Sequence, residues 1–260
     1  MPKFSVSLGY FFTDLPVPQR FQPARDAGFR AVELFWPKGW SAVTLSSAKE
    51  AADVEVVQFN MNEGDYENGD RGFACEPDRR EWWREQLLLA LDLARHLDCH
   101  RINVLPGKVP PDGDRQRSLD CFVENLQWAA PLAAVEMVQL LIEPLNHLSH
   151  PRQLCQRTID VLQVLDLVQQ KNVLLQYDVF HAQRSEGNII DTLRAHIGQI
   201  GHVQIADVPT RSSPGTGELN FENILRELDV LGYPGYVGLE YQPPNSSALP
   251  FDWLAVSQRG

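Results

Sequence analysis

Residues 138–142 read Val-Gln-Leu-Leu-Ile and are followed directly by Glu143. A run this apolar predicts a β-strand that is covered on both faces, as in a parallel sheet enclosed by helices. Seven further short apolar runs are found at 4–8, 29–35, 54–59, 101–105, 173–177, 202–205 and 236–239. The sequence therefore contains eight candidate strands.

The segments between these strands carry apolar residues at helical spacing. The pattern is clearest at 83–97 and 119–130, where apolar residues recur every three or four positions. Pro131 is expected to kink or end the second of these helices. Further helical segments are expected at 18–27, 44–52, 154–168, 190–197 and 221–231.

This alternation of strands and helices predicts an α/β fold with parallel strands, because a parallel crossover needs a dozen or more residues. Eight such units in 260 residues predict one (β/α)8 TIM barrel over 1–260. A doubly wound open sheet is disfavoured, since no Gly-x-Gly-x-x-Gly follows any candidate strand.

The composition excludes several partners. Lys and Arg number 23 and Asp and Glu 34, a net charge of −11 with no basic run, so we expect no binding of nucleic acid. No apolar stretch approaches the roughly 18–20 residues needed to span a membrane, and the first residues lack the apolar core of an export signal, so we expect a cytoplasmic protein. The four cysteines lie far apart without a C-x-x-C pair, which predicts reduced, structural thiols.

One long stretch, residues 60–79, shows neither the apolar run of a buried strand nor the spacing of a helix. It is polar, acidic and contains glycines, and it follows the third candidate strand. Loops this long in a compact domain are usually functional or disordered, and the ends of barrel strands carry the active site. We therefore expect a lid over the site, with Asn60 at its start contacting the substrate.

Oxygen-bearing side chains stand at the ends of four successive candidate strands. They are Glu143, Asp178, Gln204 and Glu240, separated by about one strand–helix unit each. In a closed barrel they would converge on one half of the rim. Carboxylates crowded at an apolar edge repel one another, which raises their pKa values or recruits a cation.

Two kinds of chemistry follow from this set, and both indicate an enzyme. All four side chains could bind a hard divalent ion, Mg²⁺ or Mn²⁺. Alternatively or in addition, Glu143 and Glu240 could act as a general acid and base that move a proton between neighbouring carbons of a hydroxy-carbonyl compound. The ion would then polarise the carbonyl and stabilise the enediolate.

Three further residues are candidates for binding the substrate. His181 follows Asp178 by three positions and is placed to donate a hydrogen bond to a substrate oxygen. Lys108 and Arg211 follow the fourth and seventh strands, and either could hold a carboxylate. The stretch 214–218 (PGTGE) could cradle an anion, although the motif is weak.

The sequence resembles the hydroxypyruvate isomerase family, within the wider group of xylose isomerase-like barrels. The resemblance runs through almost the whole chain and rests on segments that are specific only together: 27–29 (AGF), 64–75 (GDYENGDRGFAC), 101–103 (RIN), 107–108 (GK), 142–147 (IEPLNH), 176–183 (QYDVFHAQ), 201–207 (GHVQIAD), 214–218 (PGTGE) and 238–241 (GLEY).

The resemblance implies a TIM barrel in which Glu143 and Glu240 transfer protons. It also implies a divalent metal at Glu143, Asp178, Gln204 and Glu240, and the interconversion of hydroxypyruvate and 2-hydroxy-3-oxopropanoate (tartronate semialdehyde) in glyoxylate metabolism. The analogy further predicts a small hydroxy-oxo acid as the substrate and a homo-oligomer.

Some positions depart from the family pattern and leave alternatives open. Ser7 stands where the family has Asn, and Gln242 where Lys is common, so the substrate is open and 2-oxo-tetronate isomerisation remains an alternative. A sugar or polyol epimerase is a further alternative, although epimerases carry His at Gln204 and an acidic residue near Ser149. A non-catalytic sugar-acid binding protein is the third.

Overall fold

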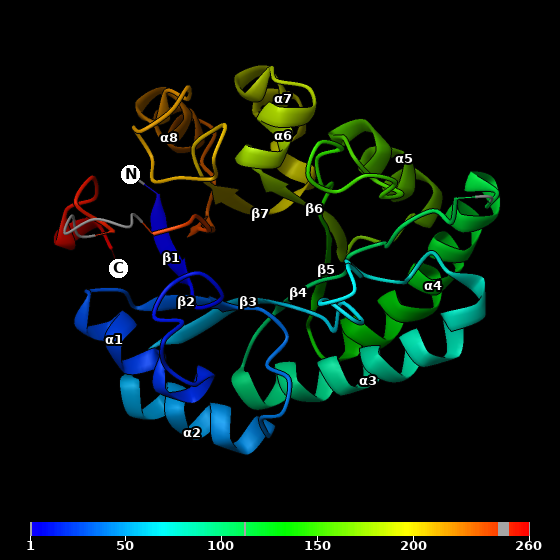
Figure 1. Cartoon of the computed structure of the whole chain (residues 1–260), viewed down its shortest axis with the longest axis horizontal. Helices are drawn as coiled ribbons and strands as arrows, with labels where there is room; N and C mark the ends of the chain where they lie inside the picture. The colour runs from blue at the N-terminus through cyan, green and yellow to red at the C-terminus, as the bar shows by residue number, and fades with distance from the viewer. Residues whose placement is uncertain (1, 112, 244–249, 260) are drawn as a thin grey trace.

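The computed structural model describes residues 2–111, 113–243 and 250–259. Over these residues eight parallel strands close into a barrel in chain order, and helices surround the ring (Figure 1). The strands are β1 Lys3–Ser7, β2 Ala31–Leu34, β3 Glu55–Asn60, β4 Arg101–Asn103, β5 Gln139–Ile142, β6 Val173–Asp178, β7 Ile200–Ile205 and β8 Tyr236–Leu239. The predicted α/β barrel is confirmed, with all eight predicted strands present.

The helices lie outside the ring and cover its outer face (Figure 1). The α-helices are α1 Phe21–Asp26, α2 Ala42–Ala52, α3 Arg80–Leu97, α4 Arg115–Val135, α5 Thr158–Val168, α6 Val179–Ser185, α7 Ile189–His196 and α8 Phe221–Val230. The 3-10 helices are η1 Val17–Gln19, η2 Pro77–Arg79, η3 Ile197–Gln199 and η4 Val256–Gln258. In the part of the chain that the structure describes, no helix is long and apolar enough to cross a bilayer.

Prolines affect two of the helical regions, and one expectation is corrected: Pro131 does not end its helix. Helix α4 continues through Pro131 to Val135. Pro131 and Gln127, whose carbonyl loses its helical donor to the proline ring, both lie on the exposed face, where water can satisfy the carbonyl. After β8, the described residues contain no α-helix and only the short η4. Pro243 and Pro250 disfavour a helix in this last unit.

The interior of the barrel is polar where an aliphatic core would be usual. Most of the strands contribute at least one buried polar side chain: Ser5, Glu33, Gln58, Asn103, Gln176, His202 and Gln204. Buried polar groups need hydrogen-bond partners, and these side chains find them largely in one another. The barrel therefore supports its rim with a connected polar layer. The four cysteines are buried free thiols, as predicted.

Candidate active site

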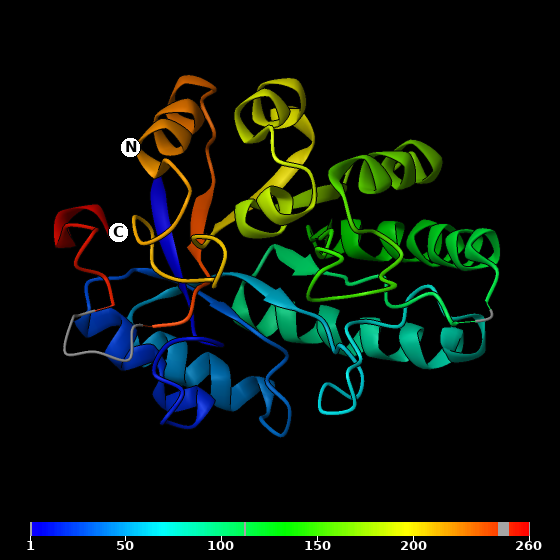
Figure 2. The ribbon, with the colours of Figure 1, turned by 45° about the horizontal axis from the view of Figure 1, so that its top comes forward.

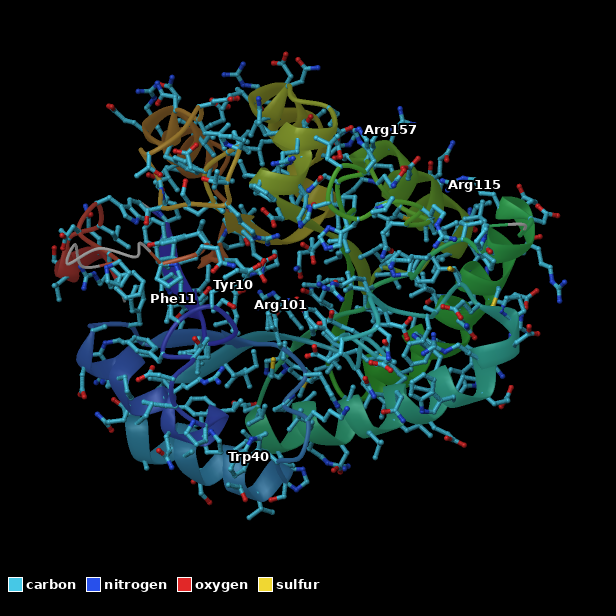
Figure 3. All side chains as sticks on the ribbon, viewed as in Figure 1. Tyr10, Phe11, Trp40, Arg101, Arg115 and Arg157 are labelled. Carbon is cyan, nitrogen blue, oxygen red and sulfur yellow. The ribbon has the colours of Figure 1, made fainter. Side chains whose placement is uncertain are left out.

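A cavity lies at the C-terminal ends of the strands, among the loops that follow them. Figure 3 shows Tyr10 toward the middle of the ring, whereas Trp40, Arg115 and Arg157 lie on its outer side. The cavity is lined by Tyr10, Phe35, Asn60, Glu63, Tyr66, Arg71, Leu105, Glu143, Leu145, His150, His181, Arg211 and Glu240.

Two glutamates of this cavity directly follow strands. Glu143 comes after β5 and Glu240 after β8, and only 4% and 5% of their surfaces are exposed. Burial raises the pKa of Glu143 to about 8; the carboxylate of Asp178 adds to the shift and Arg211 opposes it. Burial also raises the pKa of Glu240 well above its usual range. Two carboxyl groups with raised pKa values can supply one acid and one base near neutral pH.

Arg211 places a guanidinium between the carboxylates of two strands. Its Nη2 donates to Asp178 Oδ2 at 2.8 Å and to Glu240 Oε2 at 2.7 Å. The other oxygen of Asp178 accepts the backbone N–H of Phe180 at 2.8 Å, so this carboxylate caps α6 and meets Arg211 at once. Asp178 thus has the common helix-capping role as well as a place at the site.

The imidazole ring of His181, on α6, lies among these groups. Its Nδ1 accepts the backbone N–H of Asn146 at 2.9 Å, and its Nε2 lies 2.9 Å from Nη1 of Arg211, a group that only donates. Nε2 lies 3.7 Å from Asp178 Oδ2 and 3.9 Å from Glu143 Oε1. Burial lowers the pKa of His181 well below its usual range, and Arg211 adds to this. The ring is therefore neutral.

Glu33, on β2, forms the centre of a buried cluster inside the barrel. Its carboxylate accepts from Ser5 Oγ at 2.6 Å and from Gln204 Nε2 at 2.7 Å, and it lies 2.8 Å from His202 Nε2. Burial works against the charge of Glu33, but His202 and the three hydrogen bonds outweigh it and lower the pKa. His202 is thus a core histidine with a partner, as we expected.

Amide side chains connect this cluster to Glu143 at the rim of the barrel. Gln176 Nε2 donates to Gln204 Oε1 at 2.7 Å and to Glu143 Oε2 at 3.1 Å. Asn103 Nδ2 donates to the same oxygen of Glu143 at 2.7 Å and to Asn60 Oδ1 at 3.1 Å. Glu143 is therefore held by two amide donors, and its second oxygen, Oε1, is left for the cavity.

The loop after β3 forms one wall of the cavity. Irregular structure occupies 61–76, since Asn60 ends the strand and η2 begins at Pro77. Glu63, Tyr66 and Arg71 of this loop line the cavity, and Figure 2 shows the loop as a cyan segment that projects from the ring. This placement supports the lid, which stays a prediction.

Lys108 lies outside the residues that line the cavity. Its amino group donates to the carbonyl of Gly69 and so anchors the loop. Ser7, which is buried, and Gln242, which is exposed, also lie outside this lining. Of the candidates for substrate binding, the structure places His181, Arg211 and Asn60 at the cavity.

The stretch 214–218 does cradle an anion, but the anion is the chain's own Asp207. This carboxylate is fully buried and accepts hydrogen bonds of 2.8–3.1 Å from the backbone N–H groups of Val208, Gly215, Thr216, Gly217 and Leu219. A Cβ at Gly217 would stand 1.9 Å from the Val208 carbonyl oxygen, so only glycine fits there. Asp207 therefore fixes the loop that carries Arg211.

Replacing Asp207 by Ala is expected to destabilise the protein by about 2 kcal/mol or more, because several backbone donors lose a charged acceptor. The turnover of the substrate should fall with it, since Arg211 loses its position. Urea unfolding and steady-state kinetics measure the two effects. Glu218→Gln, in the exposed part of the same loop, is the matched control. Unchanged stability in the Asp207 variant would contradict the role given to this carboxylate.

Comparison with known proteins identifies the family to which this barrel belongs. The sequence model of the family described as "Xylose isomerase-like TIM barrel" matches residues 21–255. The chain belongs to this family. Within it, the chain is 35% identical to the hydroxypyruvate isomerase of Escherichia coli K12, over 98% of each chain. It is 36% identical to the 2-oxo-tetronate isomerase of Pectobacterium atrosepticum, over 97% of each.

A solved structure agrees with this assignment. The crystal structure titled "AP endonuclease, family 2 from Brucella melitensis" matches with a TM-score of 0.95 and 32% identity, over 99% of this chain and 100% of that one. The curated relatives named above are isomerases, and the sequence match covers almost the whole length of each. The barrel described here is therefore an isomerase of the same group.

The donor set fits a divalent ion of the kind that the family resemblance implies. Single oxygen or nitrogen atoms of Glu143, Asp178 and His181 lie within 4.8 Å of one another and are buried. With Glu240 the cluster has three carboxyl groups, of which Asp178 and Glu240 form ion pairs with Arg211, so it has room for more positive charge. Gln204 lies deeper, with its Oε1 bonded to Gln176, and His181 takes a place in the cluster that the sequence did not predict.

Several cavity residues escaped the sequence analysis. They are Tyr10, Glu63, Arg71 and His150 at the cavity, and Glu33 below it. A signal existed for Glu33, since a charged residue within a strand that is covered on both faces must have a buried partner. Tyr10 follows the first strand closely and would have been found by examining that strand's end.

Proposed function

We propose that this protein interconverts hydroxypyruvate and 2-hydroxy-3-oxopropanoate through an enediolate, with Glu143 and Glu240 as the acid/base pair. The observation that carries the proposal is that both glutamates are buried in one cavity and have raised pKa values. A pair in this state can accept a proton at one carbon and give one at the next.

The reaction balances with these two groups. One glutamate, as a carboxylate, removes a proton from C3 of hydroxypyruvate, and the electron pair forms the C2–C3 double bond while charge moves to the C2 oxygen. The other glutamate, as a carboxylic acid, delivers a proton to C2. The proton of the C3 hydroxyl moves to the C2 oxygen, and the C3 aldehyde forms. No atom is gained or lost.

Neighbouring residues orient the reacting groups and stabilise charge. The neutral ring of His181 contacts Arg211 and lies beside Asp178 and Glu143, and we assign it to holding these groups in place next to the substrate. Asn103 and Gln176 fix Oε2 of Glu143, so that Oε1 meets the substrate. We assign Arg211 to the charge balance of the pair through its contacts with Glu240 and Asp178.

We further propose that Glu143, Asp178 and Glu240, with His181 or Gln204, hold a divalent ion, Mg²⁺ or Mn²⁺. When bound, such an ion would polarise the substrate carbonyl. The buried carboxylates and their excess of negative charge support this assignment.

The test is the turnover of hydroxypyruvate, followed by NMR, with and without a chelator. We expect conversion to 2-hydroxy-3-oxopropanoate, with the rate falling at least tenfold in excess chelator and returning with Mg²⁺ or Mn²⁺. A full rate in chelator contradicts the metal, and the absence of conversion under every condition contradicts the activity.

A 2-oxo-tetronate is the second candidate substrate, because the relatives of that name are as similar to this chain as those named for hydroxypyruvate. It contains the same hydroxy-oxo acid unit with one more carbon. Comparing kcat/KM for the two acids in one assay separates the candidates. A DNA substrate is disfavoured, since Glu63, Glu143 and Glu240 line the cavity and the net charge is −11.

A further inference from the structure

We propose that Arg71 binds the carboxylate of the substrate and thereby restricts the isomerase to hydroxy-oxo acids over neutral sugars. The inference rests on the proposed function and names the residue that selects its substrate class. An acidic substrate must enter a cavity lined by Glu63, Glu143 and Glu240, so a cation has to receive it.

Arginine supplies the cationic side chains of the described cavity lining, at Arg71 and Arg211. Arg211 is already engaged: its Nη2 bonds to two carboxylates, its Nε donates to the carbonyl of Glu240, and its Nη1 lies 2.9 Å from His181 Nε2. The guanidinium of Arg211 is thus committed to the acid/base cluster.

Arg71, in contrast, has guanidinium nitrogens that are not used in hydrogen bonds to the described residues. Among the described residues its hydrogen bonds use Nη1 alone, to the carbonyls of Tyr66 and Asp70, and it forms no ion pair. The edge formed by Nε and Nη2 is left over, and this is an edge that binds a carboxylate through two parallel hydrogen bonds. The guanidinium stacks on the ring of Tyr66, with its central carbon 3.4 Å from the ring centre. The stack leaves the edge of the group accessible.

The backbone around Arg71 is held firmly enough to make this a preformed site. Gly72 has φ +87°, and a Cβ there would stand 2.1 Å from the Leu105 carbonyl oxygen, so the loop packs tightly on the chain after β4. The Gly72 N–H donates to the Glu63 carbonyl at 2.9 Å, and Gln153 Nε2 donates to the Arg71 carbonyl at 3.3 Å. A rigid backbone lowers the entropy that a binding residue loses.

The charge of Arg71 acts on two further residues of the cavity wall, Glu63 and His150. Burial raises the pKa of Glu63, and Arg71 counteracts the rise. Burial lowers the pKa of His150 to about 4, with Arg71 as the next cause. A carboxylate held by Arg71 would therefore lie near Glu63 and His150, which line the same cavity.

The experiment compares hydroxypyruvate with dihydroxyacetone, in which a neutral CH2OH group replaces the carboxylate. For Arg71→Gln we expect KM for hydroxypyruvate to rise about 10- to 100-fold, the range for losing a charged hydrogen-bonding partner, with kcat changed less than about threefold. The values for dihydroxyacetone should be unchanged. Arg71→Lys should fall between, because it keeps the charge and loses the two-pronged contact. Arg30→Gln is the control, because it removes an exposed charge just before β2, at the N-terminal end of that strand.

Binding is measured in parallel by titration calorimetry, which needs no turnover. If the wild-type protein binds hydroxypyruvate without converting it, the proposed function fails, and the Arg71 comparison is still decided by the affinities. Equal losses for both ligands in Arg71→Gln would show a role in loop structure only. An unchanged affinity for hydroxypyruvate would remove Arg71 from the site. Either result overturns the inference.

Discussion

Replacing Glu143 with Gln is expected to lower kcat by about 10³-fold or more while the barrel stays folded. A positioned acid or base contributes about 10²–10⁴-fold, and here the group is also one of two that must act in sequence. The amide oxygen of Gln can still accept from Asn103 and Gln176, so the local hydrogen bonds survive. Steady-state kinetics on hydroxypyruvate measure the loss, with circular dichroism to check the fold.

The matched variant Glu240→Gln should lose activity to the same degree. Solvent deuterium exchange then separates the roles, because the variant that keeps the base still exchanges the C3 proton of hydroxypyruvate although no product forms. The variant without the base exchanges nothing. Glu218→Gln, at an exposed position outside the cavity lining, should behave as the wild type. If either Glu143→Gln or Glu240→Gln turned over at the wild-type rate, the pair assignment would be wrong.

Glu143→Gln also has a predictable effect on the free energy of unfolding. The folded pKa of Glu143, about 8, lies above the value of about 4.3 for an exposed Glu, so the folded state binds more protons between these two pH values. Stability from this group is therefore full below about pH 4 and decreases as the pH rises toward 8. In chelator at pH 8, Glu143→Gln should melt above the wild type, and the difference should shrink toward pH 5. A constant difference across this range contradicts the raised pKa.

The barrel could be predicted from the sequence because each strand is covered on both faces and so reads as a short apolar run between helical segments. The exceptions have local causes. Helix α4 passes Pro131 because the lost hydrogen bond lies on the solvent side. The last unit lacks a described α-helix because prolines follow β8. Apolar periodicity reports packing and does not report where water replaces a hydrogen bond.

The site was predictable mainly at the strand ends, and at His181 and Arg211 in the segments that follow two of the strands. Glu143, Asp178 and Glu240 were found in this way, because strand ends converge whatever the loops do. Arg71 lies in a loop without periodicity, so its place at the cavity follows from contacts far apart in the sequence, such as that of Gly72 with Leu105. Lys108 shows the reverse case: a cation near a strand end that the fold uses to anchor a loop.

Arg211→Met is expected to destabilise the protein by about 3–5 kcal/mol at pH 8 in chelator. Removing one partner of a buried ion pair leaves the other charge uncompensated, and here Asp178 and Glu240 lose the same cation. Arg211 lowers the pKa values of both carboxyls, so these values rise further in the variant. Chemical denaturation between pH 5 and 8 measures the effect, and Arg194→Met, which breaks a pair with Glu227 at the surface, should leave the stability close to that of the wild type.

Two conditions should restore the stability of the Arg211→Met variant, and both act on the charge of the carboxyl cluster. Lowering the pH toward 5 protonates carboxyls whose folded pKa values are raised, so the variant should lose less stability there than at pH 8. Mg²⁺ or Mn²⁺ should also restore stability, because an ion that binds only the folded cluster stabilises it in proportion to the logarithm of its concentration. Recovery with acid alone would mean that the carboxylates repel one another without forming a metal site. Recovery with neither would mean that Arg211 stabilises the barrel through packing against Tyr10 and Phe180.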